Sequence, residues 1–280
     1  DTIEAGDGAN TITVTDGEND IDGGEGVDTI TAGNGNNTIE GGDGADVIVA
    51  GTGNNTITNA AGNATITAGT GNNTVTNTAG NSTITLGNGT NTVNLIAGNS
   101  TVVTGSGADD INITAGNNNI TAGDGNDSIS LGSGNDTVDA GAGTDAVDFS
   151  VARGTWTGAI TGAETVTATY TGSATIDATG IAGYTTLNVT ASGSTASTTL
   201  KNIGSATINL TDDSVEGGGD GDIEAMTIDT TDDATITVNL GANQEAPTAA
   251  LANLASLTIT DAASVTLKAS GGSFGNLLSH

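Results

Sequence analysis

The chain has no cysteine, one proline and one histidine among its 280 residues, and Phe, Trp, Tyr and Met together contribute only six. Without cysteine there is no disulfide, no thiolate nucleophile and no ordinary structural zinc site. So few large side chains cannot fill a wide globular core. We therefore expect a fold made of thin layers of small and β-branched residues.

Positive charge is almost missing, because three basic residues face 33 acidic ones and give a formal charge of −30. Nucleic acid and anionic membranes would repel such a chain, so we expect neither as a partner. No run of 18 apolar residues occurs, so we also expect no membrane insertion. The first residues lack the basic and apolar segments of a signal peptide, and we interpret the chain as a fragment of a longer one.

What the chain has in abundance is glycine, arranged in a strict nine-residue repeat. One Ile or Val recurs every nine positions without insertion, and four residues before all but the first of them lies a glycine. A short strand with an inward β-branched residue, followed by a tight turn, explains both registers. The repeated apolar residues are Ile3, Ile12, Ile21, Ile30, Ile39, Ile48, Ile57, Ile66, Val75, Ile84, Val93, Val102, Ile111, Ile120, Ile129, Val138 and Val147.

Most deviations from the repeat return every eighteen residues, as at Ala60, Thr78, Ile96 and Thr114. Two nonapeptides therefore make one coil. We predict an all-β fold in which residues 1–149 form a parallel β-roll, or β-solenoid, with 18-residue coils.

Residues 150–280 form a Thr/Ala/Gly-rich β region in which period-two patterns predict strands. We interpret this region as an irregular continuation of the solenoid, with a β-sandwich as the alternative. Residues 246–254 could form one helical turn. The predicted strands cover residues 164–169, 174–177, 186–190, 206–210, 226–229, 234–238 and 257–260.

Two features of this second region have two interpretations each. Phe149 and Trp156 indicate an apolar plug at the end of the roll, or a tryptophan that binds carbohydrate. The acidic loop around residues 217–219 lacks EF-hand spacing and is a solvated loop or a calcium site. Its acidic residues are Asp212, Asp213, Glu216, Asp220, Asp222 and Glu224.

The best copies of the repeat, residues 23–31 and 41–49, read GGEGVDTIT and GGDGADVIV. They resemble the RTX consensus G-G-x-G-x-D-x-U-x. That resemblance implies Ca²⁺ between the turns of successive coils, held by the Asp and by the carbonyls of the first and third positions, because calcium prefers oxygen ligands. The implied carboxylate pairs are Asp28 with Asp46, Asp109 with Asp127, and Asp127 with Asp145, while Asp136 pairs with Asn118. The implied carbonyl donors are Gly23, Glu25, Gly41, Asp43, Thr104, Ser106, Ala122, Asp124, Leu131, Ser133, Ala140 and Ala142.

The middle of the roll departs from this pattern, because no carboxylate stands at the Asp position between residues 55 and 100. The resemblance does not support calcium sites there. We expect stacked amide ladders instead. One ladder consists of Asn55, Asn73 and Asn91 and their equivalents, and the other of Asn63, Asn81, Asn99 and Asn117.

An RTX-like roll joined to a Thr-rich β region is similar to the assembly part of a bacterial surface-layer (S-layer) protein. This resemblance implies secretion by a type I pathway, calcium-driven folding at the bacterial cell surface, and self-assembly into a lattice or filament, with cell-surface polysaccharide as a further candidate partner. We expect no enzymatic activity. The alternatives are a spacer of an RTX adhesin or biofilm matrix, the secretion and folding module of a secreted enzyme, and an ice-binding solenoid that uses residues 51–54 and 69–72.

Overall fold

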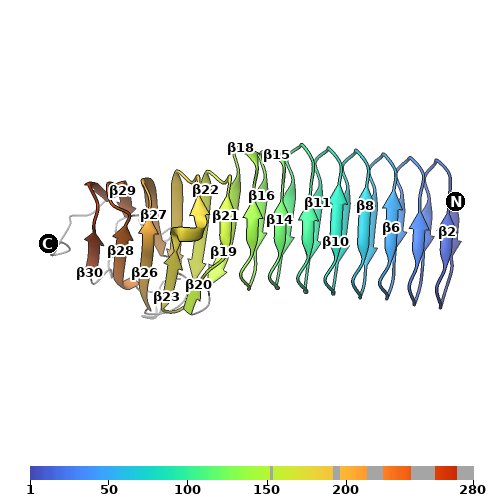
Figure 1. The fold of residues 1–280 in the computed structure, drawn as a ribbon, viewed down its shortest axis with the longest axis horizontal. Coiled ribbons are helices and arrows are strands. Elements are labelled where there is room, and N and C mark those ends of the chain that lie inside the picture. Colours follow the sequence, from blue (N-terminus) through green and yellow to red (C-terminus); the bar gives the residue numbers. More distant parts are fainter. Residues whose placement is uncertain (152–153, 192–195, 213–222, 241–255, 270–280) are drawn as a thin grey trace. The chain divides into compact units, whose positions relative to one another are not determined.

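The computed structural model describes the chain except residues 152–153, 192–195, 213–222, 241–255 and 270–280. The chain divides into two compact units, Asp1–Ala146 and Val147–His280. Both consist of parallel strands stacked coil upon coil (Figure 1). No helix in the described part of the chain is long and apolar enough to cross a bilayer.

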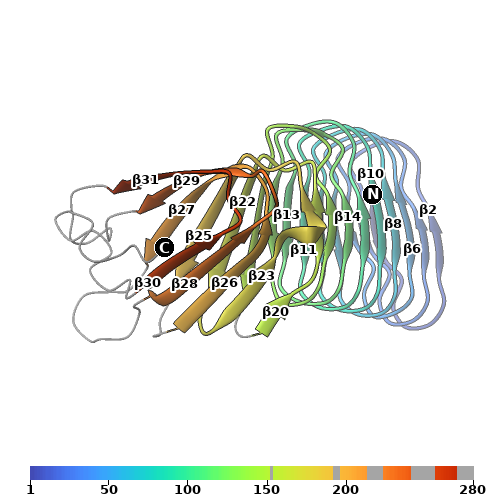
Figure 2. The same cartoon turned by 60° about the vertical axis from the view of Figure 1, so that its left-hand side comes forward.

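The first unit contains two parallel sheets of eight strands each, with successive strands alternating between the sheets (Figure 2). One sheet holds β1 (Thr2–Glu4), β3 (Asp20–Asp22), β5 (Thr38–Glu40), β7 (Thr56–Asn59), β9 (Thr74–Asn77), β11 (Thr92–Leu95), β13 (Asp110–Ile113) and β16 (Ser128–Leu131). The other holds β2 (Thr11–Thr13), β4 (Thr29–Thr31), β6 (Val47–Ala50), β8 (Thr65–Ala68), β10 (Thr83–Leu86), β12 (Thr101–Val103), β14 (Asn119–Thr121) and β17 (Thr137–Asp139). The short strands β15 (Asp124–Gly125) and β18 (Ala142–Gly143) pair between turns.

The register confirms the predicted 18-residue coil. Ile3 pairs with Ile21, Ile21 with Ile39, and Ile30 with Ile48. Each repeated residue points inward, while its neighbours in the strand face outward, as the period of a β-strand requires. Ile30 and Ile48 are fully buried, so one column of β-branched side chains per sheet forms the narrow core.

The invariant glycine of each repeat lets the coils stack closely. Gly62 has φ +98°, a conformation that strains any other residue, and a Cβ there would collide with the carbonyl of Gly44 one coil earlier. Backbone hydrogen bonds also link the turns, because the Gly44 N–H donates to the Ala61 carbonyl at 2.9 Å. Backbone hydrogen bonds therefore join successive turns as well as successive strands.

The second unit contains two sets of five parallel strands each. One holds β22 (Thr165–Tyr170), β25 (Thr186–Ala191), β27 (Ala206–Asp212), β29 (Thr235–Leu240) and β31 (Ser264–Ala269). The other holds β20 (Gly154–Trp156), β23 (Ala174–Asp177), β26 (Ala196–Ile203), β28 (Ile223–Thr230) and β30 (Ser256–Thr260). Strands β21 (Ala159–Thr161) and β24 (Ile181–Ala182) pair with each other, a 3₁₀ turn covers Ala178–Gly180, and β19 covers Ala146–Val151.

Parallel pairing makes this unit an irregular solenoid and not a sandwich. Thr165 pairs with Thr186 and Thr186 with Thr207, so these coils have 21 residues, whereas later coils are longer, as in the pairing of Thr235 with Ser264. Each of the seven predicted segments overlaps a strand, with only Glu164 and Ala234 outside, while β20, β21, β24, β26 and β31 were not predicted. The helical turn expected over 246–254 lies outside the described residues.

Candidate metal centre

The Asp of each repeat ends a turn, and its side chain is buried beneath the coil. One carboxylate oxygen, Oδ1, accepts the backbone N–H of the equivalent residue one coil earlier. The Asp28 nitrogen lies 2.9 Å from Asp46 Oδ1, and the Asp109 nitrogen lies 2.8 Å from Asp127 Oδ1. The Asp127 nitrogen likewise lies 2.8 Å from Asp145 Oδ1. The structure thus brings together the three carboxylate pairs predicted from the sequence.

The other carboxylate oxygen, Oδ2, is buried and receives no hydrogen bond in Asp28, Asp46, Asp109, Asp127 and Asp136. A charged oxygen removed from water without a donor is strongly unfavourable, and such groups are rare unless an ion is their partner. A hard cation supplies that partner, because calcium takes carboxylate and carbonyl oxygens in a flexible arrangement. The donor set therefore fits calcium, which would neutralise the carboxylates and join successive coils.

The protonation of these groups shows how unfavourable the bare charges are. Burial raises the pKa of Asp127 to about 6, and the neighbouring Asp109 and Asp145 carboxylates add to the rise against the hydrogen bond from Asp109. Burial likewise raises the pKa of Asp46 and of Asp136. Protons therefore compete with metal ions for these carboxylates.

The turns that have Asn at the Asp position of the repeat show where a positive charge would be stabilised. Asn37 Nδ2 donates to the carbonyls of Gly33 at 3.0 Å and Gly35 at 3.1 Å. It also donates to Asn55 Oδ1, at 3.0 Å. Asn19, Asn55, Asn73 and Asn91 repeat this arrangement. Each amide group thus lies where two carbonyls of its own turn converge.

The sequence reasoning missed these two carbonyls, which belong to the second and fourth positions of the repeat. In the Asp28 turn they are those of Gly24 and Gly26, and in the Asp46 turn those of Gly42 and Gly44. Carbonyls leave no mark in a sequence. The replacement of Asp by Asn at the same position was the only available sign, because an amide N–H₂ is neutral and has two donors, one for each carbonyl.

The first-position carbonyls differ between turns with and without Asp. Those of Gly41, Thr104 and Ala140 accept no hydrogen bond in the structure, whereas those of Asn59 and Asn77 accept the N–H of Thr78 and Ile96 at 3.0 and 3.1 Å. The Gly23 carbonyl accepts Asn10 Nδ2 at 3.4 Å, and that of Ala122 accepts Thr104 Oγ1 at 2.6 Å. Leu131 stands at the same position of the Asp136 turn.

The third-position carbonyls of Glu25, Asp43, Ser106, Asp124 and Ser133 accept backbone N–H groups of the preceding coil. Each keeps one lone pair, as does the equivalent Ala142. Their role as ligands, like that of the first-position carbonyls, stays a prediction.

The RTX calcium-binding nonapeptide repeat matches residues 1–30, 22–57, 31–66, 58–93, 67–102 and 113–147. Residues 1–147 belong to the RTX calcium-binding repeat family. No curated protein and no solved structure shows a significant match to the chain. RTX repeats bind calcium, which is the ion that the donor set of the buried Asp pairs fits. Because RTX proteins are typically secreted, the repeats indicate an extracellular location.

Asp136 occupies an RTX turn of a different kind. Its Oδ1 accepts both the backbone N–H and Nδ2 of Asn118, at 2.8 and 3.0 Å. Asn118 Oδ1 in turn accepts the N–H of Ser100 at 2.8 Å. Asn118 therefore contacts Asp136 through its nitrogen, and Asp136 Oδ2 is the oxygen left for an ion.

The middle of the RTX roll contains the expected ladders. Asn73 Oδ1 accepts Nδ2 of Asn55 at 2.9 Å, and Asn91 Oδ1 accepts Nδ2 of Asn73 at 3.1 Å. The second ladder is confirmed as well, since the Asn81 and Asn99 N–H groups donate to Asn63 Oδ1 and Asn81 Oδ1 at 2.8 and 2.7 Å. Asn54 and Asn72, part of the segment considered for ice binding, are joined in the same manner.

In the second unit, Trp156 is 3 % exposed and stacks on Phe149 with ring centroids 4.3 Å apart. Its ring is part of the apolar interior and is not available to stack on a sugar. The acidic loop lies outside the described residues, apart from the backbone at its two ends.

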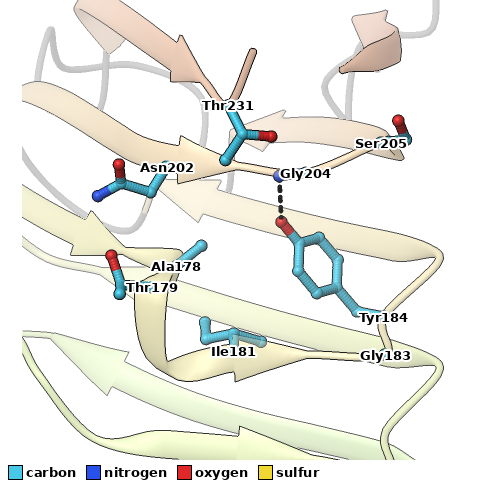
Figure 3. A pocket seen from close by; sticks show the side chains of 9 residues that line it. All are labelled: Ala178, Thr179, Ile181, Gly183, Tyr184, Asn202, Gly204, Ser205 and Thr231. Atoms are coloured by element: carbon cyan, nitrogen blue, oxygen red, sulfur yellow. Dashed lines mark hydrogen bonds between the residues drawn. The ribbon is translucent and has the colours of Figure 1, made fainter. Parts of the chain in front are cut away.

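The second unit also has a shallow cavity of about 500 Å³ (Figure 3). Tyr184 Oη accepts the Gly204 N–H at 3.1 Å across it, and burial raises the pKa of Tyr184. The cavity is lined by Ala178, Thr179, Ile181, Gly183, Tyr184, Asn202, Gly204, Ser205 and Thr231. None of these nine residues is a carboxylate, histidine or lysine, so the cavity offers no acid–base pair.

Proposed function

We propose that the chain is the assembly part of a bacterial surface-layer protein, which folds on calcium outside the cell and joins other copies of itself through calcium. The observation that carries the proposal is the set of buried Asp Oδ2 atoms without a donor, which makes a rigid roll depend on the ion. Extracellular calcium would then switch a flexible polyanion into a building block.

The surface of the roll supports the second step. Glu4, Asp22 and Glu40 are exposed and lie in register on β1, β3 and β5, with Glu4 opposite Asp22 and Asp22 opposite Glu40. Like charges directly opposite each other on neighbouring strands repel. Calcium shared with an equivalent row on another copy would relieve that repulsion and join the two copies.

A structural role also accounts for the lack of a catalytic constellation. In the part of the chain that the structure describes, no three His, Cys, Asp or Glu side chains gather into a group that could hold a metal. The buried carboxylates are instead paired with backbone N–H groups of neighbouring coils. We therefore propose that the chain is not an enzyme, and that its partners are copies of itself, with cell-surface polysaccharide as a further candidate.

Electron microscopy of the purified chain with calcium and with excess chelator tests the proposal. Ordered sheets or filaments that form only with calcium are expected. A variant with Glu4→Gln, Asp22→Asn and Glu40→Gln should still gain strand structure on calcium addition but form fewer or no arrays, because these side chains are exposed and outside the turns. Isolated monomers of the unaltered chain in both conditions would refute assembly and favour the spacer of an RTX adhesin.

A further inference from the structure

The stack of Asp28 and Asp46 ends where the next turn has Ala64 at the Asp position. Two oxygens remain without a hydrogen bond at this end. Asp46 Oδ2 and Asn59 Oδ1 both belong to fully buried side chains, and neither receives a donor. Asn59 stands at the first position of its repeat, where Gly23 and Gly41 stand in the two preceding coils, so the RTX pattern gives its side chain no role.

The two oxygens converge on one place. A Cβ built on Gly41 would lie 3.0 Å from Asn59 Oδ1 and 3.1 Å from Asp46 Oδ2. The Ile48 methyl group Cδ1 lies 3.0 Å from the same point, so glycine at position 41 leaves a small space bounded by the two oxygens and one methyl group. Two buried oxygen atoms that face the same small space and receive no hydrogen bond are the surroundings of a cation.

The coil before it shows the same arrangement with a backbone ligand. A Cβ built on Gly23 would lie 2.6 Å from Asp28 Oδ2 and 2.8 Å from the carbonyl oxygen of Gly41. One coil later, the backbone carbonyl equivalent to that of Gly41 belongs to Asn59, and it is occupied by the N–H of Thr78 at 3.0 Å. The Asn59 side chain thus puts an amide oxygen where the previous coil has a peptide oxygen.

The orientation of the Asn59 amide is set by the hydrogen bonds of its nitrogen, Nδ2. Nδ2 donates to the Ala61 carbonyl at 3.3 Å and to Asn77 Oδ1 at 3.1 Å. Turning the Asn59 amide alone would point its N–H₂ at Asp46 and lose both of these bonds. Oδ1 is therefore directed at Asp46 Oδ2 and at the space over Gly41.

We propose that Asn59 Oδ1 and Asp46 Oδ2 bind a further calcium ion at this end of the stack, with peptide carbonyls of the Asp46 turn completing its ligands. The site extends the calcium sites by one coil into a turn that has no carboxylate of its own. It concerns the metal content of the roll and does not depend on surface-layer assembly.

The next coil offers a comparison. Asn77 occupies the equivalent position, is equally buried, and its Oδ1 already accepts Ser82 Oγ and Asn59 Nδ2 at 3.1 Å each. No carboxylate lies at the Asp position of its turn or of the preceding one. Leucine fits both places, because Leu95 fills the same position one coil further on and is 1 % exposed.

Isothermal titration of the full chain with calcium, after removal of all metal, tests the site. Asn59→Leu is expected to bind one calcium ion fewer than the unaltered chain. Asn77→Leu should bind the same number but hold one ion less tightly, because Asn59 Nδ2 keeps its bond to the Ala61 carbonyl and loses its bond to Asn77 Oδ1. Asn59→Asp should keep the number and bind that ion roughly tenfold more tightly, because a charged ligand replaces a neutral one.

Full calcium binding by Asn59→Leu, with unchanged affinities, would overturn the proposal and leave the two oxygens to share a proton instead. Circular dichroism in calcium shows whether Asn59→Leu folds. If it does not, Asn59→Asp decides alone, and unchanged calcium affinities in that variant overturn the site.

Discussion

Replacement of Asp127 by asparagine compares the cost of a buried carboxylate without metal with the stabilisation that the carboxylate gives when calcium is bound. Asp127 lies between two carboxylate neighbours, since its Oδ1 accepts the Asp109 N–H and its own N–H donates to Asp145 Oδ1, both at 2.8 Å. Its side chain is 2 % exposed and its Oδ2 has no donor. The substitution changes two predicted calcium sites at once and alters the side chain by a single group.

Asparagine at this position should stabilise the metal-free roll. Burial raises the pKa of Asp127 from 3.8 to about 6, so ionisation of the folded protein at neutral pH costs about 3 kcal/mol at 1.4 kcal/mol per pKa unit. A neutral amide removes this cost. Its Nδ2 can also donate to the carbonyls of Gly123 and Gly125, as Asn73 does to Gly69 and Gly71 at 3.0 Å each. We expect the free energy of unfolding without metal to rise by about 1 to 3 kcal/mol.

Calcium should reverse the sign. The variant loses a charged ligand at both sites, and a hundredfold weaker site gives about 2.7 kcal/mol less stabilisation at saturating ion. The Asp127→Asn roll should therefore be more stable than the unaltered roll in chelator and less stable in calcium. If the asparagine acted only through its own hydrogen bonds, it would change the free energy of unfolding in the same direction with calcium and with chelator.

The folded fraction in excess chelator and urea unfolding in calcium, both followed by circular dichroism, measure the two effects. Asp110→Asn is the matched control, because it removes the same charge from an exposed neighbour of Asp109. Equal metal-free stability of the two variants, or an undiminished calcium effect in Asp127→Asn, would refute the reasoning.

The pH dependence gives an independent measurement on the same proteins. A raised pKa in the folded state contributes stability below pH 3.8, and this contribution is lost as the pH rises through about 6. Metal-free unaltered protein should therefore weaken over this window. The curve of Asp127→Asn should be flatter, and an equally steep curve would assign the loss to other carboxyls.

Three further results are expected. Excess chelator should remove much of the strand signal in circular dichroism at neutral pH, and an unchanged spectrum would contradict the calcium dependence of the roll. Asn73→Ala deletes hydrogen bonds to Gly69, Gly71 and Asn91. It should lower the free energy of unfolding by about 2 to 4 kcal/mol, equally with and without calcium. A larger loss in calcium would indicate an ion in the middle of the roll. Calcium affinity measured by titration should fall between pH 7 and pH 5, because protons compete for Asp46, Asp127 and Asp136; a constant affinity would mean that the sites bind without releasing protons.

The sequence predicted the first unit well because each physical requirement recurs with the same period. Ile30 and its equivalents must point inward, and Gly62 and its equivalents must turn with positive φ, so one coil determines the next. In the second unit the alternation of strands such as 206–210 was sufficient to find them. Coil length was not predictable there, because the connections between paired strands vary and no residue marks their ends.

The carboxylate pairs of the candidate site were predictable from the sequence, because they are formed by side chains. Asp28 and Asp46 stand eighteen residues apart in the sequence and meet in the structure through a backbone hydrogen bond of 2.9 Å. The contribution of Asn59 was not predictable, because a first-position residue of the repeat normally contributes only backbone. Its role depends on the orientation of one amide, which only coordinates can give.

The asparagine turns and the aspartate turns are two solutions to one electrostatic problem. Stacked turns direct carbonyl oxygens at a common point, as Gly33 and Gly35 do, and that point needs positive charge. An asparagine supplies it with its own N–H₂, whereas an aspartate adds negative charge and requires an ion. No charged residue occurs between positions 47 and 108, so the side chains that join the turns of these coils are neutral amides and hydroxyls.

This division has a consequence for how the roll folds. Because the middle coils need no ion, they are the part expected to hold structure when calcium is scarce, and the Asp-containing coils on either side can add to them as calcium binds. Parallel coils gain stability mainly from contact with a neighbouring coil that is already formed, so a preformed middle lowers the cost of ordering each next turn. Hydrogen exchange in chelator should then show slower exchange at Thr74 and Thr92 than at Thr29 and Thr137, and uniform exchange along the roll would mean that no calcium-independent segment exists.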